Sequence, residues 1–293
     1  MMYDLVIVGS GLYGAVSAYI AHKRGLRCIV LERRSAIGGN VRDELQEGIH
    51  VHKYGPHIFH TNNKEVWDFA NKFAEFNHFR YCPLVRSGKR LYDLPFNIKT
   101  FYEVYGVKTL QEAKMQFQKE QENEFYEHPI NLEQQTVSLV GRKFYDLLIK
   151  DYIEKQWGKK ASELPASYIN KLPLKVRHNN NYFNDRYQGI PIGGYSSWIK
   201  KMLDGIEVRL NTDFIETKDY WENQSKQIIY TGAIDEFYDY KLGALEYRSL
   251  RFEEELYHTN DYQGCATINE ISPDIPYTRS IEHKHFESGK QPV

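Results

Sequence analysis

A glycine-rich string near the amino terminus has the spacing of a phosphate-binding turn. Residues 9–14, GSGLYG, match G-x-G-x-x-G, and Glu32 follows about 20 residues later. In this motif the first glycine permits a tight turn and the second lets a pyrophosphate approach the backbone. The third glycine lets a helix pack closely on a strand, and the acid can accept hydrogen bonds from ribose hydroxyls. These residues predict a dinucleotide site.

A second glycine pair favours FAD over NAD as the dinucleotide. Gly38 and Gly39 follow Glu32 and give another place where the backbone can approach a cofactor. A pair placed after the second strand resembles that of amine-oxidase-like flavoproteins. We therefore expect FAD to be bound at these two turns.

Two histidines lie three residues apart in the string KYGPHIFHT at residues 53–61. The spacing of His57 and His60 could suit a metal, but no nearby carboxylate or cysteine completes a ligand set, so we expect no metal. Both could instead be hydrogen-bonded core residues. The three cysteines lie far apart in the sequence, as is typical of a reducing compartment.

Apolar runs and helical periodicity predict an α/β fold around these motifs. Residues 3–8 and 26–32 are typical of buried parallel strands, and residues 15–24 of the helix between them. The other elements expected are a helix at 64–75, a hairpin at 81–94, a long helix at 110–125, two helices between 132 and 156, and strands at 206–210 and 227–231.

We expect a Rossmann-like FAD-binding domain with an inserted helical substrate domain and a β-sheet region. The predicted boundaries are 1–96 for the first FAD-binding segment, 97–186 for the helical substrate or lid domain, and 187–293 for a β-rich return to the FAD domain.

Charge and hydropathy restrict the partners. Lys and Arg number 38 against 39 Asp and Glu, which removes the simplest argument for a nucleic-acid surface. The sequence has no apolar run near the roughly 18 residues that span a bilayer, and no secretory signal. We expect a cytoplasmic protein without nucleic-acid or membrane partners. The 23 tyrosines suit either sugar and base stacking or ordinary packing.

Longer strings resemble the bacterial UDP-galactopyranose mutases, in order along the whole chain. They are KYGPHIFHT at 53–61, YIEKQWG at 152–158, ELPAS at 163–167, NYF at 181–183, YQGIP at 187–191 and PYTR at 276–279. The resemblance implies interconversion of UDP-galactopyranose and UDP-galactofuranose, which supplies galactofuranose for surface polysaccharide. It implies no net redox change but a need for reduced FAD (FADH⁻), whose N5 attacks the anomeric carbon as UDP leaves.

The resemblance also implies roles for individual residues. FAD would be contacted by Gly9, Gly11, Tyr13, Gly14, Glu32, Arg33, Gly39, Asn40, His57, Ile58 and Phe214. The UDP-sugar would be contacted by Tyr81, Tyr152, Trp157, Lys171, Tyr182, Phe183, Asn269 and Arg279. His60, Lys171 and Arg279 are the candidate catalytic side chains, while the nucleophile is the flavin. A homodimer is left open as a possible assembly.

Two departures from the family pattern change what we expect, and Tyr81 also stands where the family has an asparagine near the nucleotide. Lys171 stands where the family usually has an arginine that closes over the diphosphate, so the bidentate fork is lost, although Lys175 and Arg177 are near. The family also continues for several dozen residues beyond position 293. We therefore expect this polypeptide to bind FAD weakly or to be inactive. The alternatives are an amine-oxidase-type FAD oxidoreductase and an inactive, truncated flavin-binding fragment.

Overall fold

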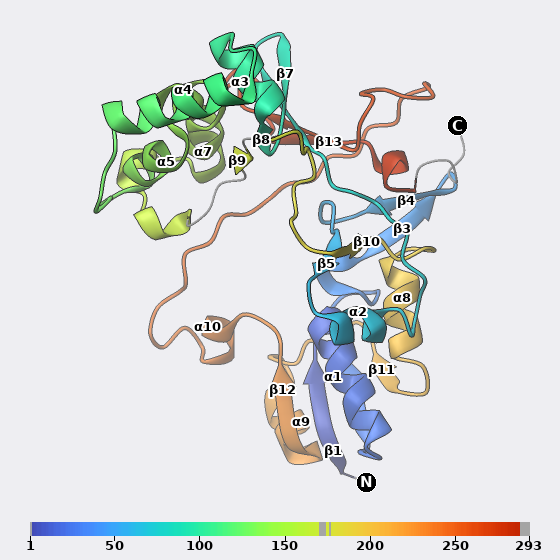
Figure 1. The fold of residues 1–293 in the computed structure, drawn as a ribbon. Coiled ribbons are helices and arrows are strands. Elements are labelled where there is room, and N and C mark those ends of the chain that lie inside the picture. The colour runs from blue at the N-terminus through green and yellow to red at the C-terminus, as the bar shows by residue number, and fades with distance from the viewer. Residues whose placement is uncertain (1, 170–173, 176, 288–293) are drawn as a thin grey trace. The chain divides into compact units, whose positions relative to one another are not determined.

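The computed structural model describes residues 2–169, 174–175 and 177–287, and the chain separates into two compact units (Figure 1). The first unit comprises Met1–Phe79, Arg186–His258 and Phe286–Val293, and the second comprises Arg80–Asp185 and Thr259–His285. Each unit is therefore assembled from segments that are distant in the sequence.

A four-stranded parallel sheet lies at the centre of the first unit. Its strands are β1 (Tyr3–Val8), β2 (Cys28–Leu31), β11 (Glu207–Arg209) and β12 (Ser225–Tyr230), in the order β11-β2-β1-β12. Counted along the chain this order is 3-2-1-4, the first half of a doubly wound dinucleotide-binding fold. The predicted Rossmann-like α/β fold is confirmed.

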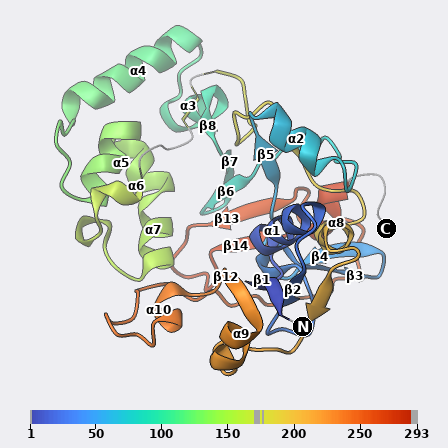
Figure 2. The same cartoon turned by 90° about the horizontal axis from the view of Figure 1, so that it is seen from below.

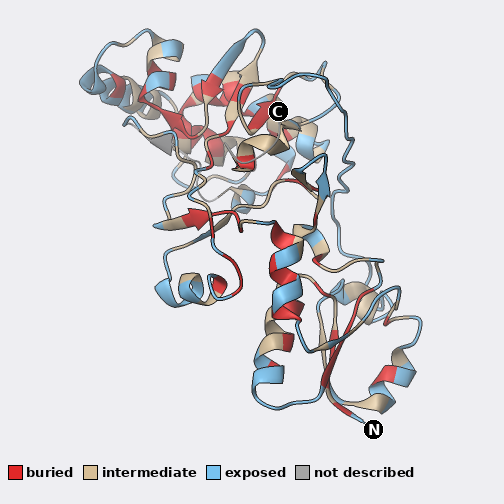
Figure 3. Ribbon diagram, turned by 90° about the vertical axis from the view of Figure 1, so that its right-hand side faces the viewer, coloured by how far each residue is buried: buried red, intermediate tan, exposed pale blue. Residues whose placement is uncertain are grey.

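Helices cover both faces of this sheet. The helix α1 (Leu12–Lys23) presents small buried residues, and Ala18 accepts a hydrogen bond from the Cys28 thiol on β2. On the opposite face Trp221 of α9 (Lys218–Gln224) packs with Val6 and Ile29. Figure 3 shows the strand that starts at the N-terminus, β1, buried over most of its length. The buried runs thus form strands that are covered on both faces, as their composition predicts.

The rest of the first unit consists of short elements, several of which share an aromatic cluster. It contains β3 (Asp43–Gln46), β4 (Ile49–His52), β5 (Phe59–Thr61), α2 (Lys64–Ala70), β10 (Tyr187–Gly189), α8 (Tyr195–Met202), α10 (Ile234–Phe237) and the short turn η1 (Gly39–Val41). The ring centroids of Phe59, Phe76 and Trp198 lie 5.2–5.8 Å apart. Part of the high aromatic content is therefore ordinary packing.

The buried carboxylate of Asp43 closes the N-terminus of α8. Its oxygens accept hydrogen bonds from the backbone N–H of Ser196 at 2.7 Å and of Tyr195 at 3.2 Å. The Nδ1 atom of His50 lies 3.0 Å from the same carboxylate. Burial opposes ionisation of Asp43, but hydrogen bonds from His50 and Ser196 hold its pKa below the ordinary value.

The second unit combines a mixed sheet with a helical block. The sheet has the order β14-β13-β6-β7, formed by β6 (Leu84–Ser87), β7 (Arg90–Asp93), β13 (Thr267–Glu270) and β14 (Arg279–Ile281). The helices are α3 (Ile98–Tyr105), α4 (Leu110–Asn123), α5 (Leu132–Val140), α6 (Arg142–Leu148) and α7 (Lys150–Trp157). Figure 2 shows α5, α6 and α7 gathered together. Short pieces complete the unit: β8 (Phe96–Asn97), β9 (Leu174–Lys175) and the single turns η2 (Ala161–Glu163) and η3 (Ala166–Tyr168). The turn η4 (His283–Glu287) begins in this unit and ends in the first.

Three expectations differ from the structure. Residues 132–157 form three helices, because Gly141 adopts a φ of 86° and Ile149 leaves helical geometry. The segment 187–293, expected to be β-rich, is mixed in its described part, since the short strands β10 to β14 alternate with α8, α9 and α10. The unit boundaries also differ from 96 and 186, because β6, β7, β13 and β14 belong to the unit that holds the helices.

None of the helices in the described ranges has the length and apolar character that a membrane span requires.

The Asp43–His50 pair predicts a stability that depends on pH. The hydrogen bond to Asp43 raises the pKa of His50 above its ordinary value of 6.5. The stabilisation of the fold by the Asp43–His50 pair is therefore fully present below pH 6.5 and is lost as the pH rises through the raised pKa of His50. In urea unfolding, His50→Gln should lose more stability relative to the wild type at about pH 6 than at about pH 9. An equal loss at both pH values would contradict the ion pair.

Candidate functional site

The two predicted glycine turns lie against each other in the first unit. The N–H of Gly38 donates a hydrogen bond to the carbonyl of Ser10 at 3.1 Å. Gly39 has a φ of 54°, and a Cβ atom there would lie 2.8 Å from the Cα of Gly11. Two turns 28 residues apart in sequence, counted from Gly11 to Gly39, therefore present bare backbone to each other.

The outer glycines of the fingerprint tolerate no side chain. A Cβ atom on Gly14 would lie 1.9 Å from the carbonyl oxygen of Gly9. Gly9 has a φ of 99°, and a Cβ there would lie 2.2 Å from Oγ1 of Thr231, the residue that follows β12. This is where the strand order reverses between β1 and β12, the place at which doubly wound folds bind dinucleotides.

The N-terminus of α1 is open to an anion. Gly11 is its N-cap, and no described side chain caps the helix or adds a carboxylate to its first turn. The N-terminus of α8 differs, because it carries the Asp43 carboxylate as its own anion. The free N–H groups and helix dipole of α1 therefore suit a diphosphate.

The acid that the fingerprint predicts to bind ribose, Glu32, is buried beside the first glycine turn. Glu32 is only 5% exposed, and its carboxylate accepts hydrogen bonds from the N–H and Oγ of Ser10 at 3.0 and 2.6 Å and from the N–H of Arg34 at 2.9 Å. A carboxylate offers about four lone-pair sites, so capacity remains for ribose hydroxyls. Glu32 thus also holds the first glycine turn in position through Ser10.

His57 contributes a buried nitrogen that the described residues leave unsatisfied. Its Nε2 atom has no hydrogen-bond partner among them, while the hydroxyl of Tyr195 holds the His57 carbonyl at 2.8 Å. Burial lowers the pKa of His57, so the imidazole is neutral at neutral pH. Buried polar atoms are normally paired, and a bound cofactor would supply a partner here.

The other predicted FAD contacts have mixed environments. Tyr13 is 71% exposed on α1, and the side chain of Arg33 is mostly exposed, 3.9 Å from Glu236. Phe214 is only 2% exposed in the core below the sheet, so only its backbone could meet a cofactor. Asn40 lies in η1 next to Gly39, and its Oδ1 accepts a hydrogen bond from Arg34. Ile58 is half-buried beside His57, and His60 is exposed on β5.

The second unit brings together the aromatic residues predicted to bind substrate. The ring of Tyr81 lies 5.6 Å from Tyr182 and 5.9 Å from Phe183, where it stacks with an interplanar angle of 27°. The N–H of Tyr182 donates to the carbonyl of Tyr81 at 2.7 Å. Residues 101 and 102 positions apart in the sequence therefore form one aromatic cluster.

Arg279 is held in a fixed orientation in the same unit. Its Nε donates to Oδ1 of Asn269 at 2.8 Å, and a terminal nitrogen donates to the hydroxyl of Tyr152 at 3.4 Å. Tyr81, Tyr152 and Tyr182 contribute to the electrostatic environment of the guanidinium. An oriented guanidinium among hydroxyl groups suits an oxyanion such as a diphosphate.

Trp157 lies near the end of α7 and pairs with an aromatic residue that sequence reasoning missed. Its ring centroid is 4.8 Å from that of Tyr168, which follows the ELPA string. The catalytic candidate Lys171 lies outside the described residues, and so do the side chains of its neighbours up to 176.

Sequence reasoning also missed two residues that support the glycine turns. Ser10 connects the first turn to Glu32, and Thr231 packs against Gly9 while its hydroxyl donates to the carbonyl of Val8. Ser10 lies inside GSGLYG, and Thr231 is the last residue of the predicted strand 227–231. Their position beside a motif was the available signal, but their partners depend on folding.

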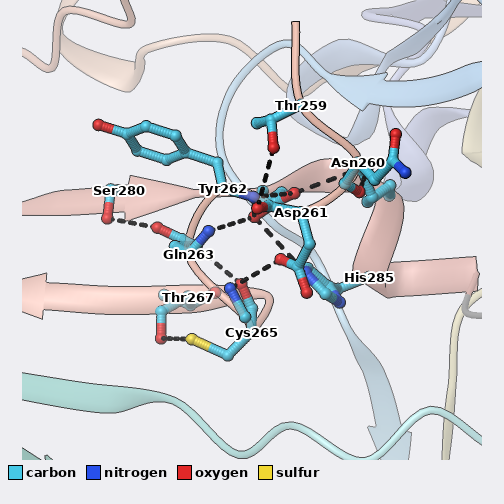
Figure 4. A network of polar contacts seen from close by, with 12 residues as sticks. Thr259, Asn260, Asp261, Tyr262, Gln263, Cys265, Thr267, Ser280 and His285 are labelled. Carbon is cyan, nitrogen blue, oxygen red and sulfur yellow. Dashed lines mark hydrogen bonds and ion pairs between the residues drawn. The ribbon is translucent and has the colours of Figure 1, made fainter. Parts of the chain in front are cut away.

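A cluster of potential metal ligands lies in the second unit, apart from the predicted histidines (Figure 4). Single ligand atoms of Asp261, Glu282 and His285 lie within 4.8 Å of one another. Backbone N–H groups of residues 262–264 already donate to these carboxylates, and the ammonium of Lys284 lies 3.9 Å from Glu282. We interpret the cluster as an ion-pair clasp that closes the loop before β13.

Two family models and several curated proteins match this chain. The family model of UDP-galactopyranose mutase matches residues 147–292, and that of an NAD(P)-binding Rossmann-like domain matches residues 7–73. A probable UDP-galactopyranose mutase of Klebsiella pneumoniae is 36% identical over 97% of this chain and 74% of its own length. A dTDP-fucopyranose mutase of Escherichia coli is also 36% identical, over 97% of this chain and 78% of its own length.

A solved UDP-galactopyranose mutase has the same fold as this chain. The crystal structure of a reduced UDP-galactopyranose mutase superposes with a TM-score of 0.66 at 14% identity, over 99% of this chain and 76% of that one. At this identity the superposition shows the fold alone. The identity to the curated relatives and the share of their length that is covered show more: the chain belongs to the UDP-galactopyranose mutase family.

Proposed function

We propose that this chain is a flavin-dependent mutase that interconverts UDP-galactopyranose and UDP-galactofuranose. The observation that carries the proposal is Arg279, oriented by Asn269 and Tyr152 beside the tyrosine cluster, in a chain whose first unit has a dinucleotide-binding turn. The first turn, Glu32 and His57 would hold FAD, and Arg279 would bind the diphosphate of the sugar nucleotide.

Reduced FAD, when bound, supplies a nucleophilic nitrogen for the anomeric carbon of the sugar. The residues of the chain supply binding and orientation. Arg279 neutralises the diphosphate as it becomes the leaving group. Burial raises the pKa of Tyr81 and of Tyr182, so both hydroxyls stay protonated and can donate hydrogen bonds to phosphate or sugar oxygens. Trp157 and Tyr168 offer flat rings for the uracil base.

A dTDP-fucopyranose mutase activity is the second candidate. The Escherichia coli enzyme of that name matches this chain as well as the Klebsiella protein does, at 36% identity. The two substrates share a nucleoside diphosphate on the anomeric carbon and differ in the methyl group of the base, the 2′-hydroxyl of the ribose and the 6-hydroxyl of the sugar. We place the UDP substrate first because two further relatives, from Mycoplasma, are UDP-galactopyranose mutases. An amine-oxidase-type reaction is not favoured, since these relatives are mutases.

The close approach of the two glycine turns predicts a strict requirement for glycine at position 39. Gly39→Ala should weaken FAD binding by about tenfold or more, because the new Cβ would force the Gly11 turn away. Gly88→Ala is the matched control: Gly88 has a φ of 57°, close to the 54° of Gly39, but has open space around it. FAD titration followed by flavin fluorescence measures both. Equal FAD affinity in the two variants would contradict the proposed cofactor site.

Replacing Arg279, the residue proposed to bind the diphosphate, by lysine should weaken nucleotide binding although the positive charge is kept. Arg279→Lys should raise the Kd for UDP by about tenfold, because an ammonium cannot reproduce the fork that Asn269 and Tyr152 orient. Arg90→Lys, on the exposed end of β7, is the matched control and should bind UDP like the wild type. Quenching of tryptophan fluorescence by UDP gives the Kd. Unchanged affinity in Arg279→Lys would remove Arg279 from the site.

The activity itself is tested with FAD-loaded protein reduced by dithionite. The proposed activity requires that incubation with UDP-galactofuranose yields UDP-galactopyranose, separated by chromatography, and that oxidised protein yields none. The same assay decides the expectation, made from the sequence, that this polypeptide is inactive. A parallel incubation with dTDP-fucopyranose distinguishes the second candidate. UDP binding without conversion of either substrate would identify a non-catalytic binding protein and overturn the proposed activity.

A further inference from the structure

Lys155 lies within the string YIEKQWG, and nothing so far gives it a role. It is on α7, three residues after Tyr152, so the two side chains extend from the same face of the helix. The neighbouring positions Tyr152 and Trp157 are the predicted substrate contacts. The lysine side chain instead turns to a loop of the same unit that is more than 110 residues later in sequence.

The Lys155 ammonium donates three hydrogen bonds to that loop. Its acceptors are the carbonyl oxygens of Ser272 at 2.8 Å, Ile275 at 3.1 Å and Tyr277 at 2.8 Å. An ammonium has three N–H donors, so its hydrogen-bonding capacity is completely used. The Ser272 carbonyl also accepts the N–H of Ile275, which closes the turn that the lysine caps.

The composition of the loop explains why it needs an external donor. The sequence from 272 to 278 is SPDIPYT, and its two prolines, Pro273 and Pro276, have no backbone N–H. The loop therefore has more carbonyl acceptors than it can pair from its own backbone. Lys155 supplies the missing donors from a helix, which is a rigid support.

The loop leads directly into the residue proposed to bind the diphosphate. Tyr277 is two positions before Arg279, and the Thr278 carbonyl is tied to the N–H of Glu270 on β13 at 3.0 Å. Arg279 meets Tyr152 of α7 at 3.4 Å. The helix α7 thus holds the loop before Arg279 through Lys155 and holds the side chain of Arg279 through Tyr152.

The ammonium lies in a partly buried and acidic environment. Burial lowers the pKa of Lys155, while the carboxylates of Glu270 and Asp151 act in the opposite direction. Glu270 is 1% exposed, and one of its oxygens lies 3.2 Å from the guanidinium of Arg86. A neutral side chain at position 155 would remove one donor from each of the three carbonyls, although the Ser272 carbonyl would keep the N–H of Ile275. The loss of these donors carries a desolvation cost.

We propose that Lys155 is a positioning residue for sugar-nucleotide binding, which fixes the 272–278 loop so that Arg279 meets the diphosphate in its bidentate orientation. This inference rests on the proposed function. Lys155 touches neither substrate nor cofactor in this role, and its effect reaches the ligand only through Arg279.

The test measures UDP affinity in a double-mutant cycle. Lys155→Met keeps the length of the side chain and removes its donors, and should raise the Kd for UDP by about tenfold. Lys150→Met, on the exposed first turn of the same helix, is the matched control and should bind UDP normally. In an Arg279→Ala background, Lys155→Met should add less than about twofold, because its path to the ligand is already lost. Lys155→Arg should restore part of the affinity.

Two results would overturn the inference. One is a folded Lys155→Met protein that binds UDP like the wild type. The other is an effect of equal size with and without Arg279, which would show a general structural role. In steady state the substitution should raise KM more than it lowers kcat, since the leaving group is bound in the ground state as well.

A second measurement remains informative if Lys155→Met does not fold or if the wild type does not bind UDP. The heteronuclear NMR signal of a three-fold hydrogen-bonded ammonium is protected from solvent exchange, and Lys155→Arg should remove one such signal. A protected ammonium signal in a protein that does not bind UDP would support the hydrogen bonds from Lys155 to the 272–278 loop, although the proposed function would then fail. The absence of any protected lysine signal would contradict the three hydrogen bonds from Lys155 to the loop.

Discussion

One steric constraint governs the first unit: its two glycine turns are packed so closely that Gly9, Gly14 and Gly39 have no room for a side chain. Gly14 packs on the Gly9 carbonyl, and Gly39 packs on the Gly11 Cα atom. The cost is borne by glycines whose positive φ values would strain other residues. The gain is a surface of N–H groups at the open N-terminus of α1 and at the reversal of strand order, where a dinucleotide diphosphate can be bound.

The remaining polar groups of the first unit make sense only with that constraint. Glu32 anchors Ser10 and so holds the first turn, and it keeps acceptor capacity for a ribose. His57 keeps a buried nitrogen for a further hydrogen bond. The second unit has a separate design, in which one guanidinium is oriented by an amide and a hydroxyl among tyrosines. A flavin-dependent mutase needs both sets of groups, one for the cofactor and one for the sugar nucleotide.

The local parts of this arrangement could be predicted from the sequence. Strand β1 begins and ends where its apolar run does, and the glycine roles follow from spacing alone. The resemblance supplied Tyr81, Tyr182 and Arg279, which the structure brings into one unit. The features that the sequence did not predict depend on contacts between residues that are distant in the sequence. The strands β6 and β13 pair across more than 180 residues, so the unit boundaries could not be found from composition. The role of Lys155 likewise depends on a loop that only folding brings to it.

The central claim, that the two glycine turns bind FAD, is tested most directly by native mass spectrometry. Purified protein would be incubated with equimolar FAD and NAD and its mass compared with that of the free chain. The account predicts a mass increase of one FAD per chain and none for NAD. A chain that takes up NAD in preference to FAD, or takes up neither dinucleotide, would contradict it.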